Sequence, residues 1–186
     1  MANVIYCDTG DLDKVMKELQ AFVSPQTSHA AMASALNRTL TFIGAETKRQ
    51  VKSEYAVTKS LDKSVEKKKA TRSDLTAEAK YTGKPLPLFI FKNSAPDNRY
   101  RSPVSVLVKK SSGMQTHSGS NPAMFKAYGN KIKLRDSGQR NIRGAYTVSI
   151  PQMVANDEVY EVIAKKAEDK LYERLLHELE WRMSKL

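Results

Sequence analysis

The segment from Pro25 to Glu54 constrains the fold most, because it has the pattern of one uninterrupted helix. Apolar positions recur in it every three to four residues, which is typical of a helix with one buried side. Ser24 is a suitable N-cap, and proline is tolerated in a first turn. Such a helix is about 45 Å long, more than a compact domain of this size needs, so we expect it to cross a whole sheet or to extend into a neighbouring molecule. Its expected inward row is Met32, Leu36, Leu40, Ile43, Thr47, Val51 and Tyr55.

Three further helices are expected. Residues 1–24 read as a short strand followed by a first amphipathic helix, and the long helix and a shorter one after Thr58 fill residues 25–70. The shorter helix would turn Leu61 and Val65 inward and end at Lys67–Lys69, where cations suit the helix dipole. A final helix, within residues 154–186, is expected to begin near Asn156.

Between these helices the hydrophobic period changes from about 3.6 to 2, which indicates strands. Residues 71–150 are therefore expected to form an antiparallel sheet. Within it, the Gly/Ser-rich segment 110–122 is predicted to be a mobile loop, and residues 136–144 a basic, polar tip. The chain as a whole is predicted to be a single α+β domain over residues 1–186, with long N-terminal and C-terminal helices packed on the sheet. The expected strands are 75–81, 104–108, 124–128, 131–135 and 145–150.

Several function classes have no support in the sequence. No run of about 18 apolar residues is present, so no membrane span is expected, and the first residues lack the pattern of a secretory signal. The single cysteine, Cys7, excludes an internal disulfide framework and suits a reducing compartment. His29, His117 and His177 lack metal-ligand spacing, and no catalytic motif occurs. We therefore expect no catalytic residues, metal, cofactor or small-molecule substrate. A nuclease-like activity that uses scattered acids and histidines is kept as a further hypothesis, beside the structural and DNA-binding functions given below. A cleavage assay with added divalent metals would test it.

The charge is unevenly distributed. The net charge is +11, but residues 58–153 hold 19 basic and 6 acidic side chains, whereas residues 1–57 are neutral and residues 154–186 carry −2. A confined positive field favours encounters with polyanions and acidic surfaces. A solvated basic surface that serves only solubility is the plain alternative.

One predicted strand concentrates this charge on a single side. Lys131, Lys133 and Arg135 alternate, so they share a face, while Ile132 and Leu134 point to the other face. Phosphate contact by such side chains would be independent of sequence and sensitive to salt. The few aromatic residues nearby lack an RNA-module signature, so base readout is not expected. The candidate contacts for a polyanion or an acidic partner are Lys109, Lys110, Lys131, Lys133, Arg135, Arg140 and Arg143.

Five short segments in a fixed order carry a family resemblance that spans roughly residues 28–180. They are Ala35–Thr39, Leu86–Phe89, Val104–Lys109, Ser149–Met153 and Arg174–Leu179. Together they resemble the prophage minor tail protein Z family, the tail completion or neck proteins of long-tailed bacteriophages. The segment Ser149–Met153, with the sequence Ser-Ile-Pro-Gln-Met, is the most specific of the five.

The resemblance implies a virion structural protein of the viral tail, assembled in the host cytoplasm. It would form a homo-oligomeric ring, expected to be hexameric, at the head-proximal end of the tail, and take part in head–tail joining around the DNA channel. Its partners would be other tail and neck proteins and passing DNA, with no membrane involved. The alternative function is a sequence-independent DNA-binding protein that uses the basic sheet face. Assembly-contact candidates are Arg38, Ile150, Pro151, Gln152 and Met153, although Ser149–Met153 also reads as a plain strand-to-helix turn.

Overall fold

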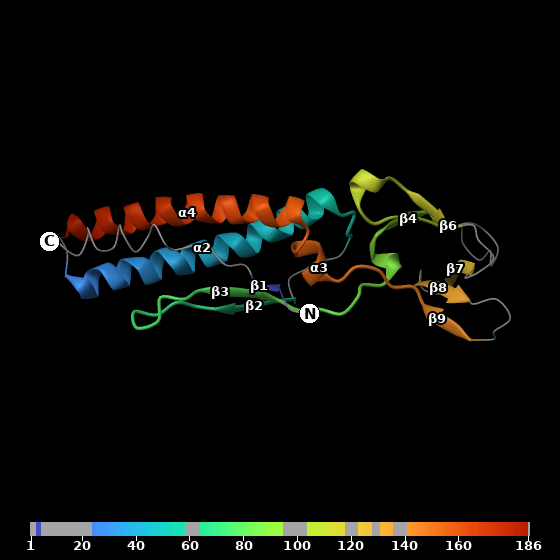
Figure 1. Ribbon diagram of the computed structural model, residues 1–186, viewed down its shortest axis with the longest axis horizontal. Helices are drawn as coiled ribbons and strands as arrows, with labels where there is room; N and C mark the ends of the chain where they lie inside the picture. The colour runs from blue at the N-terminus through green and yellow to red at the C-terminus, as the bar shows by residue number, and fades with distance from the viewer. Residues whose placement is uncertain are drawn as a thin grey trace.

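The computed structural model describes residues 3–4, 24–58, 64–94, 104–117, 123–127, 131–135 and 141–185. The molecule is elongated, with two long helices and a small sheet at one end and two further small sheets at the other (Figure 1). Long N-terminal and C-terminal helices combined with antiparallel strands confirm the predicted α+β class.

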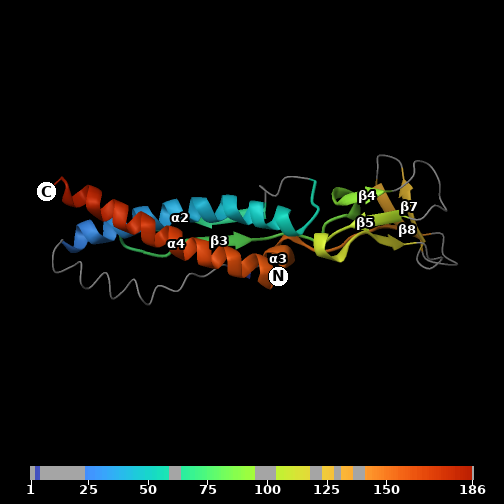
Figure 2. The ribbon, with the colours of Figure 1, turned by 90° about the horizontal axis from the view of Figure 1, so that it is seen from above.

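The two long helices agree closely with the sequence. Helix α2 (Pro25–Glu54) has the predicted bounds, and α4 (Asp157–Met183) begins directly after Asn156. The Asn156 side-chain oxygen accepts a hydrogen bond from the Glu158 backbone N–H at 3.1 Å, as an N-cap does. The helices run in opposite directions and cross in the view from above (Figure 2).

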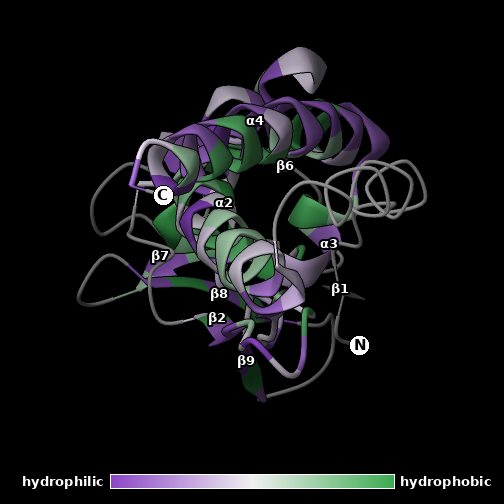
Figure 3. Ribbon diagram, turned by 90° about the vertical axis from the view of Figure 1, so that its left-hand side faces the viewer, coloured by the Kyte–Doolittle hydropathy of each residue, from purple (hydrophilic) through white to green (hydrophobic). Residues whose placement is uncertain are grey.

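Apolar side chains join α2 and α4 along their length. Toward the start of α2, alanine and methionine side chains meet leucines of α4, and small alanines let the helices approach closely. Toward the end of α2, the same interface merges with the main core, where Leu40, Ile43 and Val51 share a cluster with Val159 and Ile163. Viewed along the long axis, α2 lies between α4 and a small sheet (Figure 3).

That small sheet has the strand order β1-β3-β2 and is antiparallel. Its strands are β1 (Asn3–Val4), β3 (Glu78–Tyr81) and β2 (Val65–Lys68). The buried Tyr81 hydroxyl donates a hydrogen bond to Thr47 Oγ1 at 2.8 Å, which ties β3 to α2.

The predicted short helix ending at Lys67–Lys69 is wrong, because residues 65–68 form β2; its predicted first residues, 59–63, lie outside the described part. Pairing with β3 explains the difference. Glu66 lies opposite Lys80, and Lys68 lies opposite Glu78, so both cross-strand pairs bring opposite charges together. This tertiary pairing outweighs a local preference that sequence alone suggests.

The other end holds two three-stranded antiparallel sheets, with orders β4-β5-β6 and β7-β8-β9. The predicted hairpin is confirmed, with Ala123 opposite Arg135 and Ala127 opposite Lys131. The strands of residues 71–150 were predicted to form one sheet, but they are divided among these two sheets and the sheet β1-β3-β2. The strands are β4 (Lys92–Ser94), β5 (Val104–Leu107), β6 (Gln115–His117), β7 (Ala123–Ala127), β8 (Lys131–Arg135) and β9 (Ile142–Gly144).

Three predictions of loops or strands between residues 110 and 150 are wrong in part. The predicted mobile loop 110–122 contains a 3-10 helix (Lys110–Ser112) and β6, and the predicted polar tip contains β9. The predicted strand 145–150 is not formed, apart from an isolated bridge between Tyr146 and Pro87. The predicted first helix and the tip residues 136–140 lie outside the described residues.

Residue 150 instead begins a short helix, α3 (Ile150–Val154). The Gln152 Oε1 atom accepts a hydrogen bond from the Ser149 backbone N–H at 2.8 Å, and Pro151 lies in the first turn, where its missing N–H costs nothing. The segment is thus a helix start rather than the end of a strand, and α3 packs between the helical half and the strands.

Candidate functional site

The positive charge of the chain is concentrated at one end of the molecule. Residues 84–147, which we call the β-end, hold 12 Lys and Arg residues and 2 acidic residues, while the rest of the chain holds 19 and 18. The two acids, Asp97 and Asp136, fall outside the described residues, so the described part of the β-end contains no carboxylate side chain. The elongated molecule therefore has one strongly cationic end, while the remainder, which we call the helical half and which contains α2, α4 and the sheet β1-β3-β2, is almost neutral.

Strand β8 divides the charge as its alternation predicts. Ile132 is 2% exposed and belongs to the main core, and Leu134 packs against that core, so the opposite face carries Lys131, Lys133 and Arg135. The Arg135 guanidinium lies 5.6 Å from the centre of the Phe125 ring. None of the three cations has an acidic partner within the described part of the chain.

Two apolar side chains join these cations on the same side of the sheet. Ile142 lies opposite Arg135 in the register and is 45% exposed. Gly144 lies opposite Lys133, and the Tyr146 ring covers it so closely that a Cβ at Gly144 would come within 2.6 Å of Tyr146 Cε2. The ring is 63% exposed and lines a shallow groove together with Lys131 and Lys133. We call Lys131, Lys133, Arg135, Ile142 and Tyr146 the cationic face.

The remaining predicted contact residues lie elsewhere. Lys109 forms an ion pair with Glu158 at 2.7 Å, and this hydrogen bond raises the pKa of Lys109. The Lys110 ammonium donates to the Lys52 backbone carbonyl at 2.6 Å, near the end of α2. Both lysines therefore connect the β-end to the helical half. Arg143 lies opposite Leu134, on the other side of its sheet from the cationic face, and Arg140 lies outside the described residues.

The predicted assembly contacts are divided between core and surface. Ile150, Pro151 and Met153 are buried in the chain's own core, whereas Gln152 is exposed. Arg38 is also exposed, with its Nε atom 3.2 Å from Glu178. The local helix-start role of Ser149–Met153 accounts for its residue types, and an assembly role for the segment stays a prediction, for which Gln152 and Arg38 offer exposed side chains.

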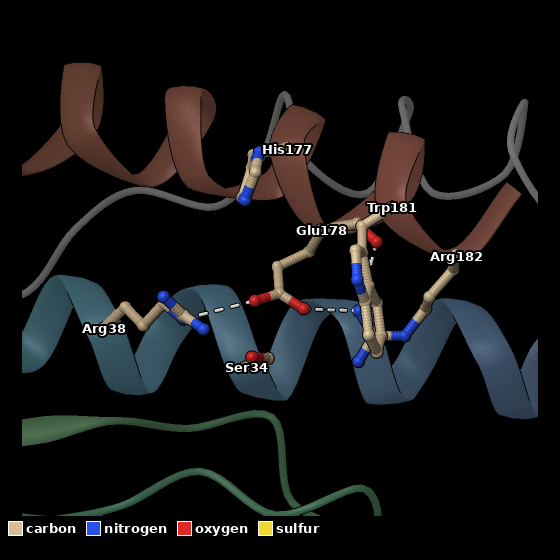
Figure 4. A pocket seen from close by; sticks show the side chains of 6 residues that line it. All are labelled: Ser34, Arg38, His177, Glu178, Trp181 and Arg182. Atoms are coloured by element: carbon tan, nitrogen blue, oxygen red, sulfur yellow. Dashed lines mark hydrogen bonds and ion pairs between the residues drawn. The ribbon is translucent and has the colours of Figure 1, made fainter. Parts of the chain in front are cut away.

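Two buried glutamates of the helical half were not predicted as site residues. Glu178 of α4 lies between Arg38 of α2 and Arg182, beside a small cavity also lined by Ser34 and Trp181 (Figure 4). Burial alone would raise the pKa of Glu178, but hydrogen bonds from Arg182 and Ser34 and the charges of both arginines lower it. The predicted i,i+4 pair of Glu178 with Arg182 is confirmed, and the network fastens α4 to α2.

Glu46 of α2 makes the second such connection to α4. Its side chain is 2% exposed and accepts from Lys166 of α4 at 2.5 Å, from Arg49 at 3.0 Å and from Gln50 at 2.7 Å. The hydrogen bond from Lys166 is the largest cause that lowers the pKa of Glu46. Sequence offers Arg49 and Gln50 as neighbours on the same helix, but Lys166 is 120 residues away.

Because both glutamates have lowered pKa values in the folded chain, their contribution to stability is present above their ordinary value of 4.5 and is lost as the pH falls through the folded-state values. We expect the free energy of unfolding to fall below about pH 4.5. The measurement is urea unfolding, followed by circular dichroism, across pH. A Glu46→Gln, Glu178→Gln double variant should show a shallower acid decline; an unchanged decline would contradict this assignment.

The fold and these sites define an α+β protein whose most distinctive feature is a charged surface rather than a catalytic cluster. In the part of the chain that the structure describes, no group of three or more histidine, cysteine or acidic side chains is placed to hold a metal ion. Among the same residues, no helix combines the length and the apolar character that crossing a membrane requires. No family model, curated protein or solved structure matches the chain.

Proposed function

We propose that this chain is a virion structural protein, a tail completion or neck component that forms a ring at the head-proximal end of a phage tail. In that position it would help to join tail to head around the DNA channel. The observation that carries the proposal is the division of an elongated molecule into a nearly neutral helical half and a β-end that holds almost the whole net positive charge. The five-segment resemblance supports the same function.

The shape and the internal contacts fit an assembly subunit. Helices α2 and α4 are joined by the ion pairs of Glu46 with Lys166 and of Glu178 with Arg38, and by apolar contacts. The β-end projects away from the helical half (Figures 1 and 2), and Lys131, Arg135, Ile142 and Tyr146 of the cationic face are exposed. Subunits with chemically different ends are suited to contacts between unlike surfaces, which generate rings when the rotation closes.

The test is assembly of the purified full chain. Light scattering and negative-stain images are expected to show closed rings, either in free solution at high concentration or on purified phage tail tubes. Tail tubes incubated with the chain should carry extra density at one end and should join to DNA-filled heads more often than untreated tubes. A chain that stays monomeric at every concentration and leaves tail tubes unchanged would contradict the proposal.

The absence of described carboxylates on the β-end favours a second candidate, sequence-independent DNA binding. Three phosphate contacts by the cationic face would weaken binding about 40-fold between 50 and 200 mM salt. The measurement is fluorescence anisotropy with two labelled duplexes of equal length and different sequence. Equal affinity for both and this salt dependence are expected. Affinity that ignores ionic strength, or that differs strongly between the duplexes, would remove this candidate.

A further inference from the structure

One side of α4 carries large apolar side chains that are exposed. Val162, Tyr172, Leu176 and Met183 are 38%, 57%, 42% and 53% exposed. Positions 162, 176 and 183 are separated by multiples of seven, and Tyr172 precedes Leu176 by four, so all four lie on one side of the helix. A row of large exposed apolar residues on one helix face indicates a surface that meets a partner.

The same face is acidic. Glu161, Glu168 and Asp169 are exposed and form no ion pair within the described part of the chain. Asp169 lies seven residues from both Val162 and Leu176, within the apolar row. Lys165 also lies on this side, but the three carboxylates outnumber it. We call Glu161, Val162, Glu168, Asp169, Tyr172 and Leu176 the acidic face.

The cationic face of the β-end has the complementary composition. It presents three cations that have no acidic partner among the described residues, together with exposed Ile142 and Tyr146. The charges of the two faces are opposite in sign, and each combines its charges with exposed apolar or aromatic side chains. Charge complementarity of this kind selects a partner and fixes its register, while apolar contact supplies much of the affinity.

We infer that the occupant of the acidic face is a second copy of this chain, which docks there through its cationic face. The two faces belong to opposite halves of an elongated molecule, so a copy that docks through its cationic face can leave its acidic face open to a further copy. A contact between unlike faces is heterologous and propagates from copy to copy until it closes. The inference rests on the proposed function, because it names the interface that would build the ring.

Charge reversal tests the inference. One variant carries Lys131→Glu, Lys133→Glu and Arg135→Glu; a second carries Glu161→Lys, Glu168→Lys and Asp169→Lys. Like charges across an interface cost several kcal/mol, so each variant alone should assemble at least about 100-fold more weakly than the unchanged chain. The chain that carries all six changes should assemble again, because its faces are once more opposite in charge, and so should an equimolar mixture of the two variants.

A matched control reverses three exposed cations outside both faces, Lys69→Glu, Arg72→Glu and Lys84→Glu, and should assemble like the unchanged chain. Circular dichroism and thermal unfolding establish that every variant is folded. The inference would be overturned if the first variant assembled at the same concentration as the unchanged chain, or if the variant with all six changes did not assemble. Neither result would contradict the proposal that the unchanged chain forms a ring. If the first variant assembles normally but no longer binds DNA, then the cationic face binds DNA rather than a second copy of the chain, and the inference is wrong. If the unchanged chain never assembles, the proposed function fails and the inference fails with it.

Discussion

Shortening Met153 to alanine is expected to lower the free energy of unfolding by about 2–4 kcal/mol. The Met153 side chain is 0% exposed and lies in the main core, where α3 meets the long helix α2 and strand β3. Removing it leaves a cavity between elements that come from distant parts of the sequence, and the rigid helices on either side limit how far that cavity collapses. Urea unfolding followed by circular dichroism measures the change.

Gln152→Ala is the matched control, because Gln152 is the next residue and is exposed. It loses the hydrogen bonds that its Oε1 atom accepts from the Ser149 backbone N–H and from the Ser149 hydroxyl, which is expected to cost about 1 kcal/mol. If Met153→Ala instead left stability unchanged and abolished binding to tail tubes, the segment would be an assembly contact, and its core role would be refuted.

The long helices were predictable because their signals are local. Ser24 and Pro25 precede α2, Asn156 precedes α4, and the apolar rows between those caps have a helical period. The same holds for β8, whose alternation correctly separates Ile132 from its charged neighbours. In each case, residues within one or two turns of each other determine the structure.

The elements that we predicted wrongly from the sequence form only by pairing with other strands. Residues 65–68 become β2 because Lys80 and Glu78 supply opposite charges across the ladder. Residues 142–144 become β9 because β8 offers a free edge with Arg135 and Lys133 in register. No local pattern in either segment indicates that a neighbouring strand is available to pair with it. Short strands of this kind gain most of their stability from that pairing.

The candidate site divides in the same way. That positive charge gathers in the middle of the chain was readable from the sequence, as was the shared face of Lys131, Lys133 and Arg135. Sequence did not separate them from Lys109, because the partner of Lys109 is Glu158, on another element. The exposed Ile142 side chain was not predicted to join those cations for a related reason, because only the register with β8 places it beside Arg135.

Glu46 and Lys166 are expected to show a coupling free energy of about 1–2 kcal/mol in a double-mutant cycle of Glu46→Gln and Lys166→Gln. The Glu46 carboxylate is 2% exposed, so the ion pair forms where water competes poorly, whereas the Lys166 ammonium is 44% exposed and escapes part of the desolvation cost. Urea unfolding at neutral pH gives the four free energies of the cycle.

The exposed pair Lys170–Glu173 is the matched control, because it has nearly the same separation, 2.6 Å, but a glutamate that is 60% exposed. Its coupling should be about 0.5 kcal/mol or less, since solvent screens it and both side chains lose freedom to form it. Glu46→Gln alone should cost more than Lys166→Gln, because the buried carboxylate also holds Arg49 and Gln50. Equal coupling in the two pairs would mean that burial of Glu46 adds nothing to the strength of its ion pair with Lys166.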